Sequence, residues 1–247
     1  MWRLAGGCPD LPVLLMALLQ QNDPSHDEDF LSDLSTRALS VAPVEDDFVA
    51  GVYAKIASVY DFFFGPTLHA GRLAAIRRLP IRPGDDVLEV GIGTGINAVL
   101  YPRDCRVTGI DFSGEMLEKA ERRVASRRLS NVRLLQMDAA DMQFPDDSFD
   151  IVFAPYVISV VHDPIKVAKE MRRVCRPGGC FVILNHFLSS NRAMARIERL
   201  ISPLTVHVGF KADVDLPAFL VQAELEPVTI EKVNIPRIWS LVTCTKE

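Results

Sequence analysis

Residues 87–95 read Val-Leu-Glu-Val-Gly-Ile-Gly-Thr-Gly, an aliphatic run that meets an acidic residue and then three glycines at every second position. Glycine weakens a strand, so three of them at a strand end need a reason. The usual reason is that the backbone passes very close to a ligand at the mouth of a parallel sheet. We therefore predict a strand here, followed by a ligand-binding turn.

Two carboxylates end the strands that we expect next. Residues 106–111 end in Asp111, and residues 132–137 are followed by Asp138. A carboxylate at the first of these places suits a pair of ribose hydroxyls. Each aspartate has an alternative role as a helix N-cap, which is frequent for aspartate after a strand. The order of the pieces along the chain favours a ligand that contains a nucleoside.

The glycine spacing separates two kinds of nucleotide ligand. A dinucleotide-binding turn has the spacing Gly-x-Gly-x-x-Gly and places a pyrophosphate at a helix N-terminus. Here the spacing is Gly-x-Gly-x-Gly, and Glu89 lies two residues before the first glycine. A carboxylate there would repel a pyrophosphate but suits a ligand with a cationic end. S-adenosylmethionine has a sulfonium, an ammonium and no phosphate.

Further elements follow from the apolar pattern. We expect strands over residues 149–154 and 180–186, one or two strands within 231–245, and helices over 48–64, 66–79, 114–128, 163–175 and 190–203. Strands that alternate with helices imply a parallel, doubly wound sheet with right-handed crossovers.

The chain resembles the class I S-adenosylmethionine-dependent methyltransferases. The matching pieces are residues 89–95, 109–117, 138–139, 144–150 and 176–179. The resemblance implies an α/β fold with a Rossmann-like doubly wound sheet, mostly parallel with an antiparallel C-terminal strand, plus N-terminal helices. It also implies S-adenosyl-L-methionine as the cofactor.

The same resemblance implies a set of cofactor-binding residues. Asp111 would bind the ribose, Met116 would cover an adenine face, and Asp138 with the Ala139 N–H would meet the adenine edge. The full set is Glu89, Gly91, Gly93, Gly95, Asp111, Phe112, Met116, Asp138, Ala139 and Ala154.

A narrower resemblance, to the soluble bacterial phosphatidylethanolamine N-methyltransferases, extends from residue 50 to the C-terminal region. It rests on Tyr53, Tyr60-Asp61, Phe64-Gly65-Pro66, Gly71-Arg72, residues 154–161, Asn185-His186-Phe187 and residues 239–242. It implies that the acceptor is the phosphatidylethanolamine head group and its methylated intermediates. Two features depart from the pattern: the first 45 residues are extra, and His162 stands where proline is expected.

The segment after the fourth strand begins Ala154-Pro155-Tyr156 and would face the transferred methyl group. It lacks the Asn/Asp-Pro-Pro-aromatic pattern of DNA and RNA amino-methyltransferases, so we do not expect methylation of a base nitrogen. The candidates are Tyr60, His186 and His69 for catalysis, and Tyr53, Tyr156 and Arg192 for the substrate. Each of these residues has an alternative role without a function in the site. Tyrosines often pack in cores, a lone histidine is often structural, and arginines often line a solvated helix face.

Composition narrows the partners and the location. The net charge of −5 argues against an extended nucleic-acid surface, and five scattered cysteines without a CxxC pair predict reduced thiols and no metal site. We expect an N-terminal extension and acidic linker over 1–47, and a methyltransferase domain over 48–247 whose first helices, 48–80, meet substrate and membrane. The protein would be cytoplasmic and peripheral on the inner face of the membrane, reached through Phe62 to Phe64 and a basic cluster of Arg72, Arg77 and Arg78.

Two rival functions stay open. Methyltransferases for a quinone ring or another small metabolite share the Phe-Pro-Asp-x-Ser-Phe-Asp and Arg-Pro-Gly-Gly motifs. A non-catalytic module that only binds S-adenosylmethionine would carry the same cofactor residues, because those residues indicate cofactor binding and do not indicate turnover.

Overall fold

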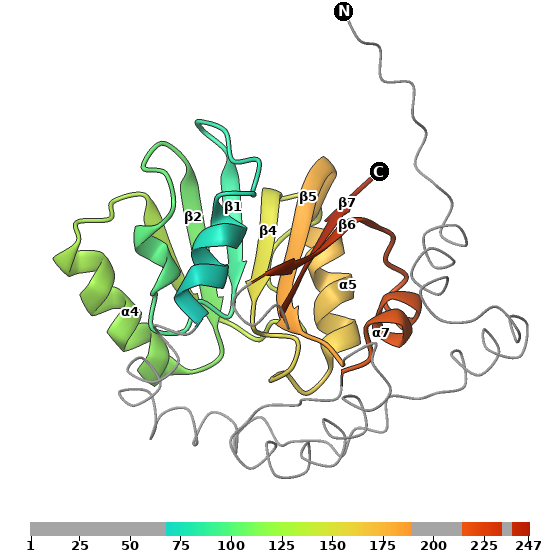
Figure 1. Cartoon of the computed structure of the whole chain (residues 1–247). Helices are drawn as coiled ribbons and strands as arrows, with labels where there is room; N and C mark the ends of the chain where they lie inside the picture. The colour runs from blue at the N-terminus through green and yellow to red at the C-terminus, as the bar shows by residue number, and fades with distance from the viewer. Residues whose placement is uncertain (1–67, 189–213, 234–238) are drawn as a thin grey trace, which may run out of the picture.

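The computed structural model describes residues 68–188, 214–233 and 239–247. Its centre is a seven-stranded sheet in the order β3-β2-β1-β4-β5-β7-β6 (Figure 1). The strands are β1 (Asp86–Val90), β2 (Arg106–Asp111), β3 (Val132–Gln136), β4 (Phe149–Pro155), β5 (Cys175–His186), β6 (Pro227–Val233) and β7 (Trp239–Thr245). The helices are a segment over 68–76, the short η1 (Asn97–Val99), α4 (Gly114–Ser126), α5 (Pro164–Val174) and α7 (Leu216–Gln222).

The strand directions match the predicted fold class. β1 to β5 are parallel to one another, and β7 runs antiparallel to both β5 and β6. The chain winds from β1 outward to β3 and then returns to place β4 on the other side of β1. Ligands bind at this kind of reversal, outside the carboxyl ends of the strands. The Rossmann-like fold is therefore confirmed, and its switch point lies between β1 and β4.

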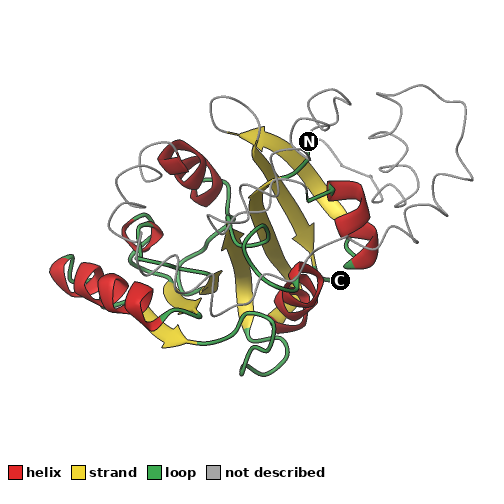
Figure 2. Cartoon of the chain, turned by 90° about the horizontal axis from the view of Figure 1, so that it is seen from below, coloured by secondary structure: helices red, strands yellow, loops and turns green. Residues whose placement is uncertain are grey.

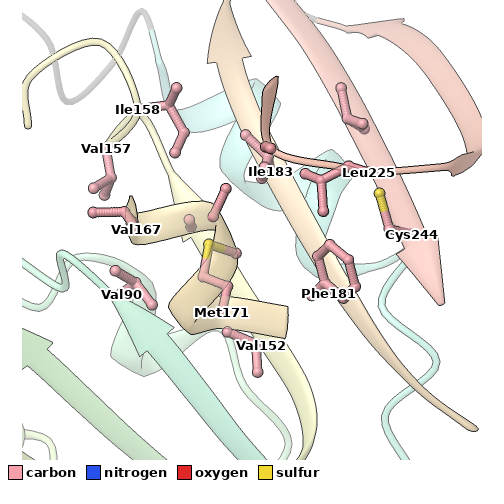
Figure 3. Packing of buried hydrophobic residues seen from close by; sticks show 14 of the residues in the cluster. Val90, Val152, Val157, Ile158, Val167, Met171, Phe181, Ile183, Leu225 and Cys244 are labelled. Atoms are coloured by element: carbon pink, nitrogen blue, oxygen red, sulfur yellow. The ribbon is translucent and has the colours of Figure 1, made fainter. Parts of the chain in front are cut away.

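Helices cover both faces of the sheet (Figure 2), and alternation along each strand divides the core between them. On one face, Val152 of β4 and Ile183 of β5 gather with Val167 and Met171 of α5 (Figure 3). On the opposite face, Val87 of β1 belongs to the cluster that includes the helix over 68–76. Because strand side chains alternate with a period of two, Glu89 falls on the same face as Val87. The fold thus turns a carboxylate toward that helix.

The ends of the predicted elements shift for local reasons. β5 was predicted to begin at residue 180 but begins at Cys175, because a register irregularity against β4 separates the pairs Phe149–Cys175 and Ile151–Cys180. Helix α7 was missed, since it is only seven residues long and contains Pro217. The predicted helices over 48–64 and 190–203 and the boundary at residue 47 lie outside the described residues. No helix within the described ranges combines the length and apolarity needed to cross a bilayer.

The third glycine of the turn after β1 is a packing position. Gly95 has a φ of +73°, and a Cβ there would lie 3.1 Å from Cβ and 3.2 Å from Cα of Ala120 in α4. Its left-handed backbone and its contact with a helix both favour glycine. Gly95 does not line the pocket described below, so its place in the turn is explained by the approach of α4.

Replacing Gly95 with alanine should destabilise the fold more than the same change at Gly93. Both positions have positive φ, which costs an alanine about 1–2 kcal/mol, but a Cβ at Gly93 meets nothing within 4 Å. Crowding at Ala120 should add roughly 1–3 kcal/mol at Gly95 alone. Denaturant unfolding of the two variants without ligand measures the difference, and equal losses would contradict the packing account.

Candidate active site

A pocket of about 380 Å³ opens at the carboxyl ends of the central strands, a size that suits a small ligand. The turns after β1, β2, β3 and β4 line it, together with the start of α5 and one residue of the helix over 68–76. It brings together most of the residues predicted for the cofactor and one predicted for the substrate. These are Glu89, Gly91, Gly93, Asp111, Phe112, Met116, Asp138, Ala139 and Tyr156.

Asp111 ties the glycine turn to the end of β2. Its carboxylate accepts the Gly93 N–H at 2.8 Å and the Ser113 N–H at 2.9 Å. Burial raises the pKa of Asp111, although these hydrogen bonds oppose the shift. Ser113 is the N-cap of α4, because its Oγ accepts the Met116 N–H. Asp111 is therefore not the cap of this helix, and each carboxylate oxygen keeps capacity for a ligand hydroxyl.

The far end of the pocket has the character of an adenosine site. Asp138 is exposed, and its Oδ1 accepts the Ala140 N–H at 2.7 Å, which forms a turn and does not cap a described helix. Met116 is buried beneath the pocket, whereas the Phe112 side chain is 46% exposed at its edge. Apolar surfaces next to carboxylates suit the flat base and the hydroxyls of a nucleoside.

At the opposite end, Glu89 is a buried carboxylate that is 1% exposed. One carboxylate oxygen accepts a hydrogen bond from Nδ2 of Asn97 at 2.7 Å, and the other accepts one from the hydroxyl of Tyr101 at 2.6 Å. Burial raises the pKa of Glu89 to about 7, while these two hydrogen bonds and the nearby Arg72 charge partly oppose the rise. Sequence reasoning missed Asn97 and Tyr101, whose one signal was a polar side chain within an otherwise apolar stretch.

Tyr156 follows β4 with a strained backbone, at φ +64°. Its hydroxyl donates to the carbonyl of Leu68 at 3.1 Å, and its ring meets that of Trp239 edge-on with centroids 4.9 Å apart. The side chain is therefore held from two sides, and the residue lines the pocket. Ala154, also predicted for the cofactor, is fully buried and does not line the pocket.

The candidate bases do not gather at the pocket. His69 is exposed, and His186 is buried with its ring 5.6 Å from that of Trp239; neither lines the pocket. His162 does line it, and it is the only one of the three described histidines that does so. The catalytic role of His69 and His186 stays a prediction. Tyr53, Tyr60 and Arg192 lie outside the described residues.

Arg72 corrects one expectation. It was predicted to attract the membrane as part of a basic cluster with Arg77 and Arg78; those two are exposed, but Arg72 is only 7% exposed. The prediction was wrong because Arg72 lies four residues after the buried Leu68 and so falls on the buried stripe of the helix. Its guanidinium carbon lies 5.1 Å from the centre of the Tyr156 ring, and the residue lines the pocket.

The chemistry of these groups fits S-adenosylmethionine. The adenosine end offers the carboxylates of Asp111 and Asp138 beside apolar surface, and the end near β1 offers the carboxylate of Glu89 to a cationic amino acid portion. Gly91 keeps the turn against the segment after β4, since a Cβ there would lie 2.3 Å from a methyl group of Val157. When bound, the cofactor supplies a methyl group activated by its sulfonium.

Replacing Asp111 with alanine should weaken binding of S-adenosylhomocysteine by roughly 2 kcal/mol, about 30-fold, because charge-assisted hydrogen bonds are lost. The Gly93 and Ser113 N–H groups also lose their acceptor. Calorimetry measures the affinity, with Asp111→Asn as the control that keeps one acceptor oxygen. An unchanged affinity in the alanine variant would remove Asp111 from the cofactor site.

Because of the Glu89 carboxyl, the free energy of unfolding should fall as the pH rises. Its folded pKa of about 7 exceeds its usual value of 4.5, so the folded state binds the proton more tightly than the unfolded chain does. This stabilising contribution is complete below pH 4.5 and is lost as the pH rises to about 7. Between pH 4.5 and 7.5 the wild type should lose about 3 kcal/mol relative to Glu89→Gln, which cannot ionise. Urea unfolding of both proteins at several pH values tests this, and parallel pH profiles would contradict it.

Comparisons with known proteins agree with this geometry. A family model described as a methyltransferase domain matches residues 88–183. The phosphatidylethanolamine N-methyltransferase of Cereibacter sphaeroides is 40% identical over 186 residues, which are 75% of this chain and 91% of that protein. The demethylmenaquinone methyltransferase of Geobacillus kaustophilus is 34% identical over 148 residues, 57% of this chain and 63% of that protein.

Solved structures share the fold at low identity. The [4+2]-cyclase SpnF has a TM-score of 0.70 at 18% identity, covering 83% of this chain and 97% of that one. The geranyl diphosphate C-methyltransferase of Streptomyces coelicolor has a TM-score of 0.63 at 16% identity, covering 72% and 79%, and its structure holds S-adenosyl-L-homocysteine. With a relative this similar over nine-tenths of its length, the chain belongs to the class I S-adenosylmethionine-dependent methyltransferases.

Proposed function

We propose that this methyltransferase transfers methyl groups to the amine of phosphatidylethanolamine and its methylated intermediates, towards phosphatidylcholine. The observation that carries the proposal is the 40% identity with a bacterial phosphatidylethanolamine N-methyltransferase over 91% of that protein. Reaction on a bilayer lipid also requires contact with a membrane surface, which we propose as a reversible, peripheral contact. The aromatic segment that we expect to make it, Phe62 to Phe64, lies outside the described residues.

Methyl transfer is an in-line displacement, so the protein contributes mainly by positioning the two reactants. The acceptor side of the pocket is formed by the segment after β4, with the ring of Tyr156 and the apolar side chains of Val157, Val160 and Val161. Apolar walls exclude water from the amine and lower the cost of keeping it uncharged. This arrangement supports an amine acceptor that enters from the β4 side.

The attacking amine must lose its proton before it can accept the methyl group. Among the described residues, His162 places an imidazole in the pocket lining, next to Val161. We therefore add His162 to Tyr60, His69 and His186 as a candidate for holding that proton.

A second candidate is methylation of a quinone ring, supported by the 34% identity with demethylmenaquinone methyltransferase. The motif that such enzymes share with this chain, residues 144–150, does not line the pocket. Instead, Arg173 of α5 pairs with Asp146 at 2.8 Å and donates to the carbonyl of Phe144. The motif serves the scaffold, so sharing it does not favour a quinone over a lipid.

The test is transfer of a labelled methyl group from S-adenosylmethionine to vesicles that contain phosphatidylethanolamine, with separation of the lipid products. We expect mono-, di- and trimethylated lipids from the wild type, and much less of each from Asp111→Ala, the matched control, at a cofactor concentration below its dissociation constant. Co-sedimentation with vesicles is measured in parallel. Transfer to a demethylated menaquinone in place of the lipid would support the quinone candidate, and cofactor binding without transfer to either would support a non-catalytic module.

A further inference from the structure

Arg72 is a buried charge whose place in the fold needs a reason. It lies on the stripe of the helix that also carries Leu68, Ala75 and Ile76, all of them buried. Removing a guanidinium from water costs several kcal/mol unless opposite charge or hydrogen bonds compensate. A chain that keeps arginine here, where an aliphatic residue would pack, is expected to use it.

The contacts of Arg72 leave one donor open. Its guanidinium lies over the ring of Tyr156, and its Nη1 has no hydrogen-bond partner among the described residues. The carboxylate of Glu89, which feels the charge of Arg72, is already engaged through both oxygens by Asn97 and Tyr101. A buried donor without an acceptor is costly, and it lines a pocket. These facts indicate that the acceptor is a ligand atom.

The position of Arg72 along the pocket indicates which portion of the ligand would lie next to it. Asp111, which suits the ribose, ends β2, and Asp138, which suits the adenine, comes after β3; both strands lie on one side of β1 in the sheet. Arg72 lies at the other end, with Glu89 of β1 and with Tyr156, which follows β4. That end therefore presents one cation and one anion within an enclosed space. The amino acid portion of S-adenosylmethionine is a zwitterion, with one carboxylate and one ammonium.

We propose that Arg72 binds the α-carboxylate of the methionine portion of the cofactor, and that Glu89 faces the cationic groups of the same portion. A guanidinium matches a carboxylate in shape and can donate two parallel hydrogen bonds to it. A lipid phosphate is the other candidate anion for this arginine, but it would carry its charge toward Glu89. The proposal concerns the cofactor alone and does not depend on which acceptor is methylated.

Calorimetry with two ligands tests the proposal without turnover. S-adenosylhomocysteine carries the carboxylate, whereas 5′-methylthioadenosine lacks the amino acid portion. Arg72→Gln should weaken binding of S-adenosylhomocysteine about 10- to 100-fold, the effect of losing a charge-assisted pair. Its affinity for methylthioadenosine should stay within about twofold of wild type. Arg77→Gln, an exposed arginine on the same segment, should change neither affinity.

Two outcomes would overturn the proposal. An equal loss for both ligands would mean that Arg72 only shapes the pocket, and an unchanged affinity for S-adenosylhomocysteine with a raised KM for lipid would assign Arg72 to the acceptor. If Arg72→Gln does not fold, a comparison of two ligands on the wild type still tests the proposal. It should bind S-adenosylhomocysteine at least tenfold more tightly than its decarboxylated analogue, and equal binding of the two would refute the carboxylate contact.

Discussion

The burial of Glu89 is the constraint on which the rest of the site depends. A carboxylate at the end of a central strand cannot stay in an apolar core without donors. Asn97 and Tyr101 supply them, and both come from the chain just beyond the glycine turn. The turn is thus fixed at both of its ends, by Glu89 behind it and by Asp111 at the Gly93 N–H. Two carboxylates, rather than apolar packing alone, set the shape of the cofactor pocket.

The fold was predictable because its signals are local. Alternating apolar residues and the glycine turn located β1 and β2, and the spacing of apolar residues located α4 and α5. Elements whose bounds depend on tertiary pairing were harder to predict from sequence. The early start of β5 depends on a register irregularity with β4, and α7 depends on an Asp215 cap and on burial of Phe219.

The residues of the site likewise divide into those that the sequence predicts and those that depend on the fold. Residues in a contiguous motif, such as Gly93 and Asp111, were found from spacing and order. Arg72 was misjudged because basic residues were grouped by proximity along the chain, although its spacing from Leu68 placed it on the buried stripe. Tyr101 gave no recognisable pattern, because its meaning comes from a contact with Glu89 that only the fold creates.

The methyl acceptor is harder to infer from the residues than the cofactor is, for a physical reason. Residues that shape the cofactor pocket are tied to one another by side-chain hydrogen bonds, whereas the lining after β4 includes Val157, Val160 and Val161, whose side chains are apolar and do not specify a polar group of the substrate. Solved relatives of this fold include a protein named as a cyclase and another named as a C-methyltransferase. A shared scaffold therefore leaves the reaction partner open.

The contact between Gly91 and Val157 limits how independently the two halves of the site can change. A single added methyl group on Gly91 would overlap a methyl group of Val157, so the cofactor turn and the acceptor segment touch without spare volume. Grafting the segment after β4 from a relative with another substrate would succeed only if the residue at this position stayed small enough to clear the turn. The segment after β4 is thus not a modular insert, because a change in it is coupled by this contact to the cofactor turn.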